Sequence, residues 1–290
     1  MTKKALVLIN PVSGIGKQKV IENLISDNID SALLRVDIKY TQYHAHAHEL
    51  AKSAVGKYDI VVAVGGDGTV NEVGTALIGT DTALAIVPAG SGNGLARHLK
   101  IPLNLRKAVK LLNNFQTKCI DSIKINDFYS LNVAGIGFDA HISHLFAKKK
   151  HRGVTAYMKL VAAEFATYKA DEYHLTIDSK ELDTKAYLIS FANSSQYGNN
   201  IYIAPDAEID DGLIDVCIVN GFPKIIAPAL LISMLGRDNI RGYLDKIVKA
   251  KEIVIEHPNE LSGHIDGEPV FFGKKVTIKI NPLSLKVIVP

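Results

Sequence analysis

The stretch that decides the fold is Val61-Val62-Ala63-Val64-Gly65-Gly66-Asp67-Gly68-Thr69-Val70-Asn71-Glu72-Val73. Four apolar residues lead into a glycine-rich turn, and a helical pattern follows it. Glycines allow the backbone to turn sharply and to bring its N–H groups close to a ligand. The first turn of a helix adds unpaired N–H groups and a positive dipole end. The stretch therefore predicts a buried strand, a phosphate-binding turn and a helix.

A purely structural interpretation of the same turn is available. Thr69 and Glu72 have the spacing of a capping box, and Gly68 could serve the turn alone. The capping box would explain where the helix begins. It leaves the two glycines and the acid before it unexplained, so we favour the phosphate-binding interpretation.

A second glycine-rich loop follows the next apolar run. This loop reads Pro88-Ala89-Gly90-Ser91-Gly92-Asn93-Gly94. Neighbouring parallel strands bring their following loops to the same edge of a sheet, so both loops and residues 10–17 are expected there. The chain contains no Walker A sequence, and no dinucleotide fingerprint follows its first strand. The loops therefore predict a nucleotide site of another design.

The first third of the chain alternates between apolar strands and helices. Strands are expected at 5–9, 34–40, 60–64 and 83–87, and helices at 18–26, 45–55, after the loop at 65–69 and at 105–112. This alternation is typical of an α/β domain whose parallel sheet is covered on both faces. We expect residues 1–122 to form this domain and to bind a nucleotide.

The pattern changes after about residue 120. Short strands and Asp-Gly turns predominate, with a long helix at 155–169, a second helix near 228–235 and a last strand at 285–289. Residues 123–282 are therefore predicted to form a β-rich domain that holds substrate and metal.

The composition excludes several classes of protein. The chain has 290 residues, of which 47% are hydrophobic and 22% charged, as in a globular protein with a sizeable core. A net charge of +3 is too small to indicate a nucleic-acid binder. Two cysteines make no disulfide framework and favour a reducing, cytoplasmic setting. No apolar run approaches the roughly 20 residues of a membrane span.

At these residues the chain resembles the catalytic-domain superfamily of diacylglycerol kinases, sphingosine (long-chain base) kinases and their bacterial lipid-kinase relatives. The matching segments run through nearly the whole chain in family order. They are Asn10-Pro11, GGDGTVNEV at 65–73, PAGSGNGLARHL at 88–99, AGIGFDA at 134–140, DGLIDV at 211–216 and DGE at 266–268. GGDG by itself is less specific, because NAD kinases and phosphofructokinases share it.

The resemblance implies an α/β domain of the NAD kinase/diacylglycerol kinase type, a β-sandwich second domain and an active site in the cleft between them. It also implies that the final strand, at 283–290, returns to the first domain. ATP would be contacted by polar and glycine residues of the loops: Asn10, Thr41, Gly65, Gly66, Gly68, Thr69, Asn71, Ser91, Gly92 and Asn93. Thr41 could instead be the N-cap of the helix that follows it.

Two acids compete for the role of general base. Glu268 matches the proton acceptor assigned in bacterial lipid kinases, and Asp67 matches the aspartate given that role in sphingosine kinases. We favour Glu268, with Asp67 orienting phosphate, Mg²⁺ or the hydroxyl. Taken without the resemblance, residues 266–268 would be an ordinary hairpin turn.

The resemblance also suggests substrate and metal contacts. Asp139 resembles the acid that meets the lipid headgroup in sphingosine kinases, although it could simply cap a loop. Arg152, in a basic run, is a weaker candidate for a phosphate contact, and the run could equally be a solvated loop or bind anionic lipid headgroups.

Asp211 resembles the acid of a structural Mg²⁺ site that backbone carbonyls of Glu208 and Leu213 would complete. A solvated Asp-Gly turn accounts for Asp211 equally well. The three histidines within residues 44–48 do not share one helix face, so we expect no metal site there.

A long-chain substrate needs an apolar slot. The helix at 155–169 and the segment at 225–235, which Pro228 interrupts, are the candidates. The sequence thus predicts an ATP- and Mg²⁺-dependent lipid kinase, cytoplasmic and peripheral at the membrane, that phosphorylates a hydroxyl of a diacylglycerol- or long-chain-base-like lipid. It leaves room for a homodimer. The alternatives are an NAD kinase-like enzyme and a non-catalytic regulatory protein that binds nucleotide or lipid.

Overall fold

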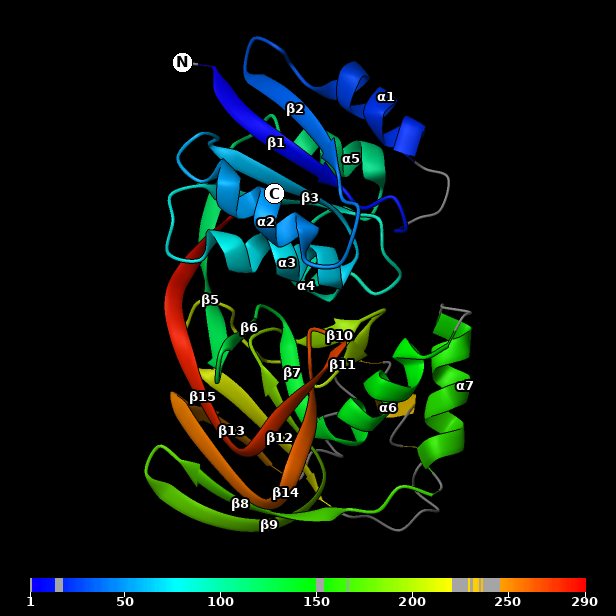
Figure 1. The fold of residues 1–290 in the computed structure, drawn as a ribbon, viewed down its shortest axis with the longest axis vertical. Coiled ribbons are helices and arrows are strands. Elements are labelled where there is room, and N and C mark those ends of the chain that lie inside the picture. The colour runs from blue at the N-terminus through cyan, green and yellow to red at the C-terminus, as the bar shows by residue number, and fades with distance from the viewer. Residues whose placement is uncertain are drawn as a thin grey trace. The chain divides into compact units, whose positions relative to one another are not determined.

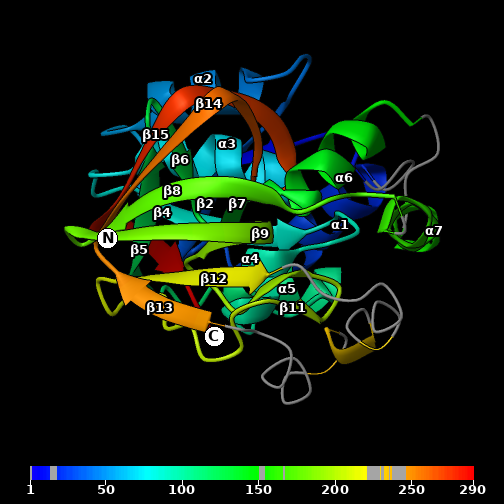
Figure 2. The ribbon, with the colours of Figure 1, turned by 90° about the horizontal axis from the view of Figure 1, so that it is seen from below.

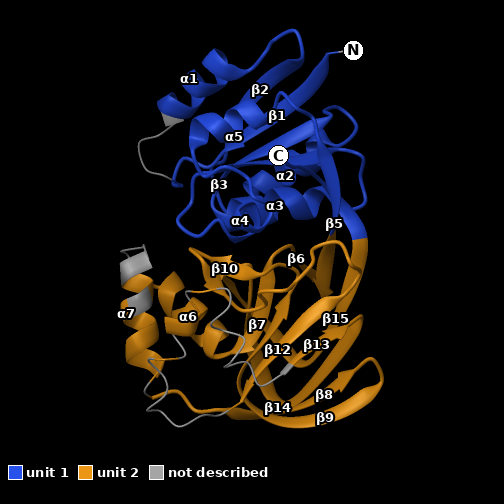
Figure 3. Cartoon of the chain, turned by 180° about the vertical axis from the view of Figure 1, so that it is seen from behind, with its two compact units in different colours: residues 1–120, 283–290 blue, residues 121–282 orange. Residues whose placement is uncertain are grey.

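The chain divides into two compact units. The computed structural model describes residues 2–13, 18–149, 154–165, 167–220 and 246–290, together with residues 229, 232–234 and 236. Unit 1 comprises residues 1–120 and 283–290, and unit 2 comprises residues 121–282 (Figure 3). Each unit is described separately below.

Unit 1 alternates strands and helices (Figure 1). Its elements are β1 (Lys3–Ile9), α1 (Gln18–Asn28), β2 (Leu34–Tyr40), α2 (His46–Ala54), β3 (Ile60–Gly65), α3 (Asp67–Leu77), β4 (Ala83–Pro88), α4 (Gly94–His98) and α5 (Leu105–Leu111). Strands β2, β1, β3 and β4 follow one another in parallel pairs. The strands and helices expected from the alternation are present, and α4 is an additional short helix.

Burial explains the apolar runs of unit 1. All residues of β3 and β4 are buried, so these strands are apolar throughout. At the edge of the sheet, β2 buries only Leu34 fully and exposes most of its other residues. The end of β15 (Glu268–Ile288) completes the other edge, where Val287 lies opposite Leu84 of β4 in a parallel pair.

Unit 2 is built mainly from antiparallel strands. Besides β15 its elements are β5 (Thr117–Ile125), β6 (Phe128–Ser130), β7 (Val133–Gly137), α6 (Phe138–Ala147), α7 (Val154–Phe165), β8 (Asp171–Ile177), β9 (Lys180–Ala192), β10 (Gln196–Gly198), β11 (Ile201–Tyr202), β12 (Ile214–Asn220), β13 (Lys246–Ala250) and β14 (Glu252–Ile265). Strands β13, β12, β9, β7, β14 and β15 follow one another in antiparallel pairs. Figure 2 shows β8, β9, β12 and β13 side by side. The strands of the whole chain are therefore mixed in direction.

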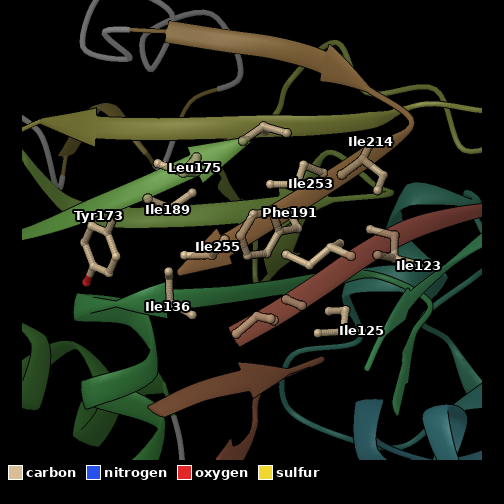
Figure 4. Close-up of a cluster of buried hydrophobic side chains, with 14 of the residues drawn as sticks. Ile123, Ile125, Ile136, Tyr173, Leu175, Ile189, Phe191, Ile214, Ile253 and Ile255 are labelled. Atoms are coloured by element: carbon tan, nitrogen blue, oxygen red, sulfur yellow. The ribbon is translucent and has the colours of Figure 1, made fainter. Parts of the chain in front are cut away.

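The central strands of unit 2, namely β7, β12 and the second half of β9, bury both of their faces. One face carries a cluster that includes Ile136, Ile189 and Phe191 (Figure 4). The alternate residues point the other way and include Leu188 and Cys217. Helices α6 and α7 cover this second face, which we call the helix-covered face. Its cluster draws Phe138, Ile142, Leu160, Val161 and Phe165 from the two helices.

Two expected segments need comment. The helix expected at 155–169 is α7, which ends at Phe165. Most of the segment at 225–235 lies outside the described residues, as do residues 14–17 of the first loop. Within the described residues, no helix is both long enough and apolar enough to cross a membrane.

Candidate functional site

The two glycine loops of unit 1 are packed against each other. A Cβ built at Gly90 would lie 2.3 Å from the Cα of Gly66, so this approach requires glycine. The carbonyl oxygen of Gly65 accepts hydrogen bonds from the backbone N–H groups of Ala89 and Gly90, at 2.8 and 3.1 Å. The register that sets Gly65 opposite Pro88 makes the loops neighbours. The carboxyl ends of β3 and β4 thus carry one joined structure.

Asp67 ties the first loop to the second. Its Oδ2 accepts a hydrogen bond from the N–H of Asn93 at 2.8 Å, and its Oδ1 accepts one from the N–H of Gly94 at 2.7 Å. A Cβ at Gly92 would lie 2.6 Å from Asp67 Oδ2, so a larger residue there would push the carboxylate out of these hydrogen bonds. In this arrangement Asp67 holds the second loop in position. That role competes with proton abstraction, because both carboxylate oxygens already accept hydrogen bonds.

Asn10 connects the end of β1 to the same loops. Its Nδ2 donates to the hydroxyl of Thr69 at 3.0 Å, and its Oδ1 accepts from the N–H of Val12 at 3.0 Å. Thr69 is buried beneath Gly65, where a Cβ would lie 2.4 Å from the threonine Oγ1. Polar contacts therefore join the segments that follow three parallel strands, which is the arrangement expected of a phosphate site.

The capping-box interpretation of Thr69 and Glu72 is wrong. Helix α3 has Gly66 as its N-cap, with no side-chain hydrogen bond. Glu72 instead accepts hydrogen bonds from the N–H groups of Ala45 and Ala47, at 3.0 and 3.1 Å, at the start of α2. A contact with the neighbouring helix has replaced the local one.

The other predicted nucleotide residues lie at the same strand ends. Thr41 is buried directly after β2, and its N–H donates to the carbonyl of Ile9 at 3.0 Å. It is not the N-cap of α2, which is Ala45. Asn93 has a left-handed φ of 54°, and its Nδ2 donates to Gly90 O at 2.9 Å. Ser91 is exposed within the second loop.

Gly68 and Asn71 lie in the first two turns of α3. Contact between ATP and the predicted residues of these loops stays a prediction.

Asp139 is the centre of a buried polar network in unit 2. Its Oδ2 accepts hydrogen bonds from Ser190 Oγ at 2.9 Å and Tyr197 Oη at 3.1 Å, and lies 3.1 Å from His264 Nε2. Its Oδ1 accepts from the N–H of Ala140 at 2.8 Å. Only this last contact is local, so Asp139 does more than cap a loop. Its contact with a lipid headgroup stays a prediction.

The tyrosine hydroxyls near Asp139 remain protonated at neutral pH. Burial, and then the charge of Asp139, raise the pKa of Tyr197 well above its ordinary value. The same two causes, followed by the charge of Asp171, raise the pKa of Tyr168 to about 12. Tyr197 therefore acts as a hydrogen-bond donor to the carboxylate.

The segment at 266–268 forms a hairpin turn. Asp266 and Gly267 have φ values of 49° and 89°, the positive pair expected in a two-residue turn between antiparallel strands. Asp266 is buried and accepts hydrogen bonds from the N–H groups of residues 131, 132 and 133 at 3.0–3.2 Å, and from the hydroxyl of Ser130. Asp266 therefore fixes the hairpin to residues 130–133.

Glu268 is left exposed at the start of β15, paired with Ile265 across the hairpin. The carbonyl of Gly267 accepts a hydrogen bond from Ser143 Oγ of α6 at 2.9 Å. The turn is thus tied to the helix that begins with Phe138 and carries Asp139. An exposed carboxylate on an anchored turn can accept a proton from a hydroxyl, and the assignment of Glu268 as base stays a prediction.

Asp211 already has a cationic partner in this structure. Its Oδ2 lies 2.6 Å from Lys249 Nζ, and its Oδ1 accepts from the N–H of Leu213 at 3.0 Å. The same ammonium lies 3.3 Å from the buried Asp215. The pKa of Asp215 is above its ordinary value, because burial raises it more than Lys249 lowers it. Lys249 therefore stands where the expected Mg²⁺ would neutralise Asp211. The carbonyls of Glu208 and Leu213 remain predicted ligands.

The histidines of α2 have structural partners. His46 stacks on Tyr43 with ring centroids 4.4 Å apart, and its Nδ1 accepts from the N–H of Gln42 at 3.0 Å. His48 Nδ1 lies 3.2 Å from the carbonyl of Glu72. No group of three or more metal-ligating side chains gathers within the part of the chain that the structure describes. Arg152 lies outside that part.

The apolar residues predicted to line a lipid slot belong to the core. Leu160, Val161 and Phe165 of α7 are each 6% exposed and pack on the helix-covered face.

Ser190, Tyr197 and His264 are functional candidates that the sequence did not indicate. The one feature of the sequence that could have indicated them is Gly135. A Cβ there would lie 2.3 Å from Asp139 Oδ2 and 3.1 Å from His264 Nε2, so the network requires a residue without a side chain. Without the strand register, the partners of that glycine cannot be named.

Comparison with known proteins covers both units. Residues 4–125 match the model of the diacylglycerol kinase catalytic domain, and residues 132–289 match the model of the YegS C-terminal NAD kinase beta sandwich-like domain. A protein of Klebsiella pneumoniae (strain 342) named "probable lipid kinase YegS-like" is 31% identical over 80% of this chain and 78% of its own length. A Yersinia enterocolitica protein of the same name is 28% identical over 94% and 92%.

Solved structures agree with this assignment. The crystal structure of a diacylglycerol kinase from Bacillus anthracis str. Sterne has a TM-score of 0.82 and 26% identity, and the match covers 99% of this chain and 97% of that one. Sequence and structure comparisons thus extend over nearly the whole length. The chain therefore belongs to the YegS-like lipid kinase family and carries its diacylglycerol kinase catalytic domain.

Proposed function

We propose that this kinase transfers the γ-phosphate of ATP to a hydroxyl of a diacylglycerol- or long-chain-base-like lipid. The observation that carries the proposal is the joining of two glycine loops by Asp67, whose carboxylate receives the N–H groups of Asn93 and Gly94. Phosphoryl transfer depends on positioning and on neutralising phosphate charge more than on covalent chemistry by the protein. A pair of loops that are held together and rich in N–H groups would position the phosphates.

Unit 1 supplies the nucleotide contacts in this proposal. The first turn of α3 leaves N–H groups without partners inside the helix, and these would face the phosphates. Asn10 and Thr69 would fix the nucleotide beside them. Mg²⁺ would accompany ATP and reduce the charge on its phosphates. Both oxygens of Asp67 already accept hydrogen bonds, so we assign no ligand of this chain to that ion.

Unit 2 supplies the acceptor contacts. Glu268 would take the hydroxyl proton as the oxygen attacks phosphorus, and Asp139 would orient the headgroup. The apolar residues of the helix-covered face would receive the hydrocarbon chain. We further propose that the lipid is reached at a membrane surface by a cytoplasmic protein bound peripherally to it.

The relatives do not favour an NAD kinase, because those described above are named as lipid kinases. Retention of Asp67, Asp139 and Glu268 argues against a purely regulatory protein that binds nucleotide or lipid without turnover.

The test is a radiolabelled ATP assay with diacylglycerols, monoacylglycerols, long-chain bases and ceramides presented in mixed micelles, and with NAD in parallel. We expect label in at least one lipid and none in NAD. Label in NAD alone would overturn the proposal. Binding of ATP without transfer to any acceptor would support the regulatory alternative.

A further inference from the structure

His264 has one buried ring nitrogen without a hydrogen-bond partner. The residue is 2% exposed, and its Nε2 lies 3.1 Å from Asp139 Oδ2. Among the described residues, His264 Nδ1 and Asn193 Oδ1 are the two buried side-chain nitrogen or oxygen atoms that lack a partner. Burying a polar atom without a partner costs free energy, so this nitrogen calls for a partner that the described groups of the chain do not supply.

The strand register explains how His264 reaches Asp139. Neighbouring residues across β14, β7 and β9 are His264, Gly135 and Ser190. Cross-strand neighbours share a face, and here it is the helix-covered face, where Leu188 also lies. Gly135 carries no side chain between the other two, and the carboxylate of Asp139 enters the space that this leaves. The four residues form a built polar site.

The contact with Asp139 favours one tautomer of the ring. A carboxylate that accepts from Nε2–H holds a neutral imidazole in the Nε2–H tautomer, which leaves Nδ1 as a bare acceptor. Ser190 and Tyr197 complete the contacts of the same carboxylate oxygen, so Asp139 has little freedom to turn away. Nδ1 is therefore ready to accept a hydrogen bond from a hydroxyl.

The surroundings indicate what kind of molecule would carry that hydroxyl. The helix-covered face carries buried hydrocarbon side chains such as Phe138, Phe165 and Leu188, and tyrosines such as Tyr187 and Tyr197 pack among them. A buried acceptor nitrogen beside both polar and hydrocarbon side chains suits a ligand with a hydroxyl headgroup and a hydrocarbon chain. Nδ1 is covered in this structure, so a ligand can reach it only if side chains over the ring move.

We infer that His264 Nδ1 accepts a hydrogen bond from the headgroup of the acceptor lipid, with Asp139 as the positioning residue that sets the tautomer. This inference rests on the proposed lipid kinase function and deepens it. It assigns recognition of the headgroup to a histidine that directly precedes the 265–268 hairpin, and it leaves proton abstraction to Glu268.

The first test compares His264→Gln with wild type. The glutamine amide can still donate toward Asp139, but the Nδ1 acceptor is lost. We expect the KM for dioctanoylglycerol or sphingosine to rise about tenfold or more, with kcat and the KM for ATP changed less than about twofold. His257→Gln is the matched control, because His257 is also buried on β14 and its Nδ1 contacts Asn259 instead. An unchanged lipid KM in His264→Gln would overturn the inference.

The second test does not need turnover. In ¹⁵N-histidine-labelled protein, we expect His264 to show a bare Nδ1 whose resonance shifts when dioctanoylglycerol or sphingosine is added without ATP. An Nδ1–H tautomer, or a resonance that neither lipid shifts, would overturn the inference and indicate a structural histidine or a water-bound nitrogen. Failure of the proposed function would appear differently, as wild-type protein that labels no lipid in the radiolabelled assay.

Discussion

Each unit contains a carboxylate at the centre of a group of hydrogen bonds, and the two groups differ in whether backbone or side chains supply the donors. In unit 1, Asp67 is held by backbone N–H groups and is enclosed by glycines. In unit 2, Asp139 is held mainly by the side chains of Ser190, Tyr197 and His264. A centre made of backbone tolerates almost no added atom. A centre made of side chains can be changed one contact at a time. The predictions below use this difference.

The largest expected effect concerns Glu268, which belongs to neither centre. Glu268→Gln should lower kcat by about 10²- to 10⁴-fold, because a neutral amide cannot accept the hydroxyl proton. ATP binding, measured by calorimetry, should stay at the wild-type level. Asp67→Asn is the contrasting variant, and it should weaken ATP binding by loosening the second loop. If the Glu268→Gln variant turned over at the wild-type rate, Glu268 would be excluded as the general base.

The next effect tests the rigidity of the backbone-built centre. Gly90→Ala places a Cβ 2.3 Å from the Cα of Gly66, where only backbone can yield. We expect about 3 kcal/mol of lost stability by denaturant unfolding and a loss of measurable ATP affinity. Gly66→Ala is the control, because its Cβ would lie 3.3 Å from Gly90 Cα. Because Gly66 is itself a predicted ATP contact, the comparison uses stability alone, and equal losses of stability in the two variants would contradict the close-packing explanation.

A smaller effect is expected from the matching glycine of unit 2. Gly135→Ala directs a Cβ at Asp139 Oδ2, 2.3 Å away, and the carboxylate can yield by giving up hydrogen bonds of its network, whereas at Gly90 backbone itself would have to move. The free energy of unfolding should fall by about 1–2 kcal/mol. The lipid KM should rise while ATP affinity stays constant. A stability loss as large as that of Gly90→Ala would mean that the two centres do not differ as described.

The smallest effect concerns Lys249 and metal ions. Lys249→Met should lower the free energy of unfolding by about 1 kcal/mol, which corresponds to a few degrees in melting temperature. The loss arises because the buried Asp215 is left without its cation, and it stays small because the lysine is partly exposed. Wild type should melt at the same temperature with EDTA as with Mg²⁺, whereas the variant should gain stability from Mg²⁺. Lys251→Met, at a nearby exposed position, is the control. A wild-type melting temperature lowered by EDTA would show that a metal binds beside Lys249.

The sequence predicted the parts of the molecule that are local. Strands β3 and β4 read as continuous apolar runs because both faces are covered, and the glycine loops after them were visible in the spacing of their residues. The expected hairpin at 266–267 also forms, with the positive φ values that Asp-Gly accepts. Each of these features depends on residues that are close in the chain.

The features that the sequence missed depend on tertiary contacts. Glu72 had the spacing for a local cap but serves α2 instead, because that helix packs beside α3. The five residues of α4 are too few for a periodic pattern, and Asp67, from another loop, caps the helix. His264 and Ser190 meet Asp139 through strand register, which the pattern of apolar residues does not reveal.

The last strand also governs the order in which the chain can fold. Val287 pairs with Leu84, the N–H of Gly79 donates to the carbonyl of Ser284 at 2.8 Å, and the N–H of Val289 donates to that of Gln116 at 2.9 Å. During synthesis, the β4 edge of the unit 1 sheet therefore stays unpaired until the ribosome has added residues about 200 positions further along the chain. Until then β4 presents an open, apolar edge to other chains. A growing polypeptide can therefore pair with another chain through this edge until its last strand has been made.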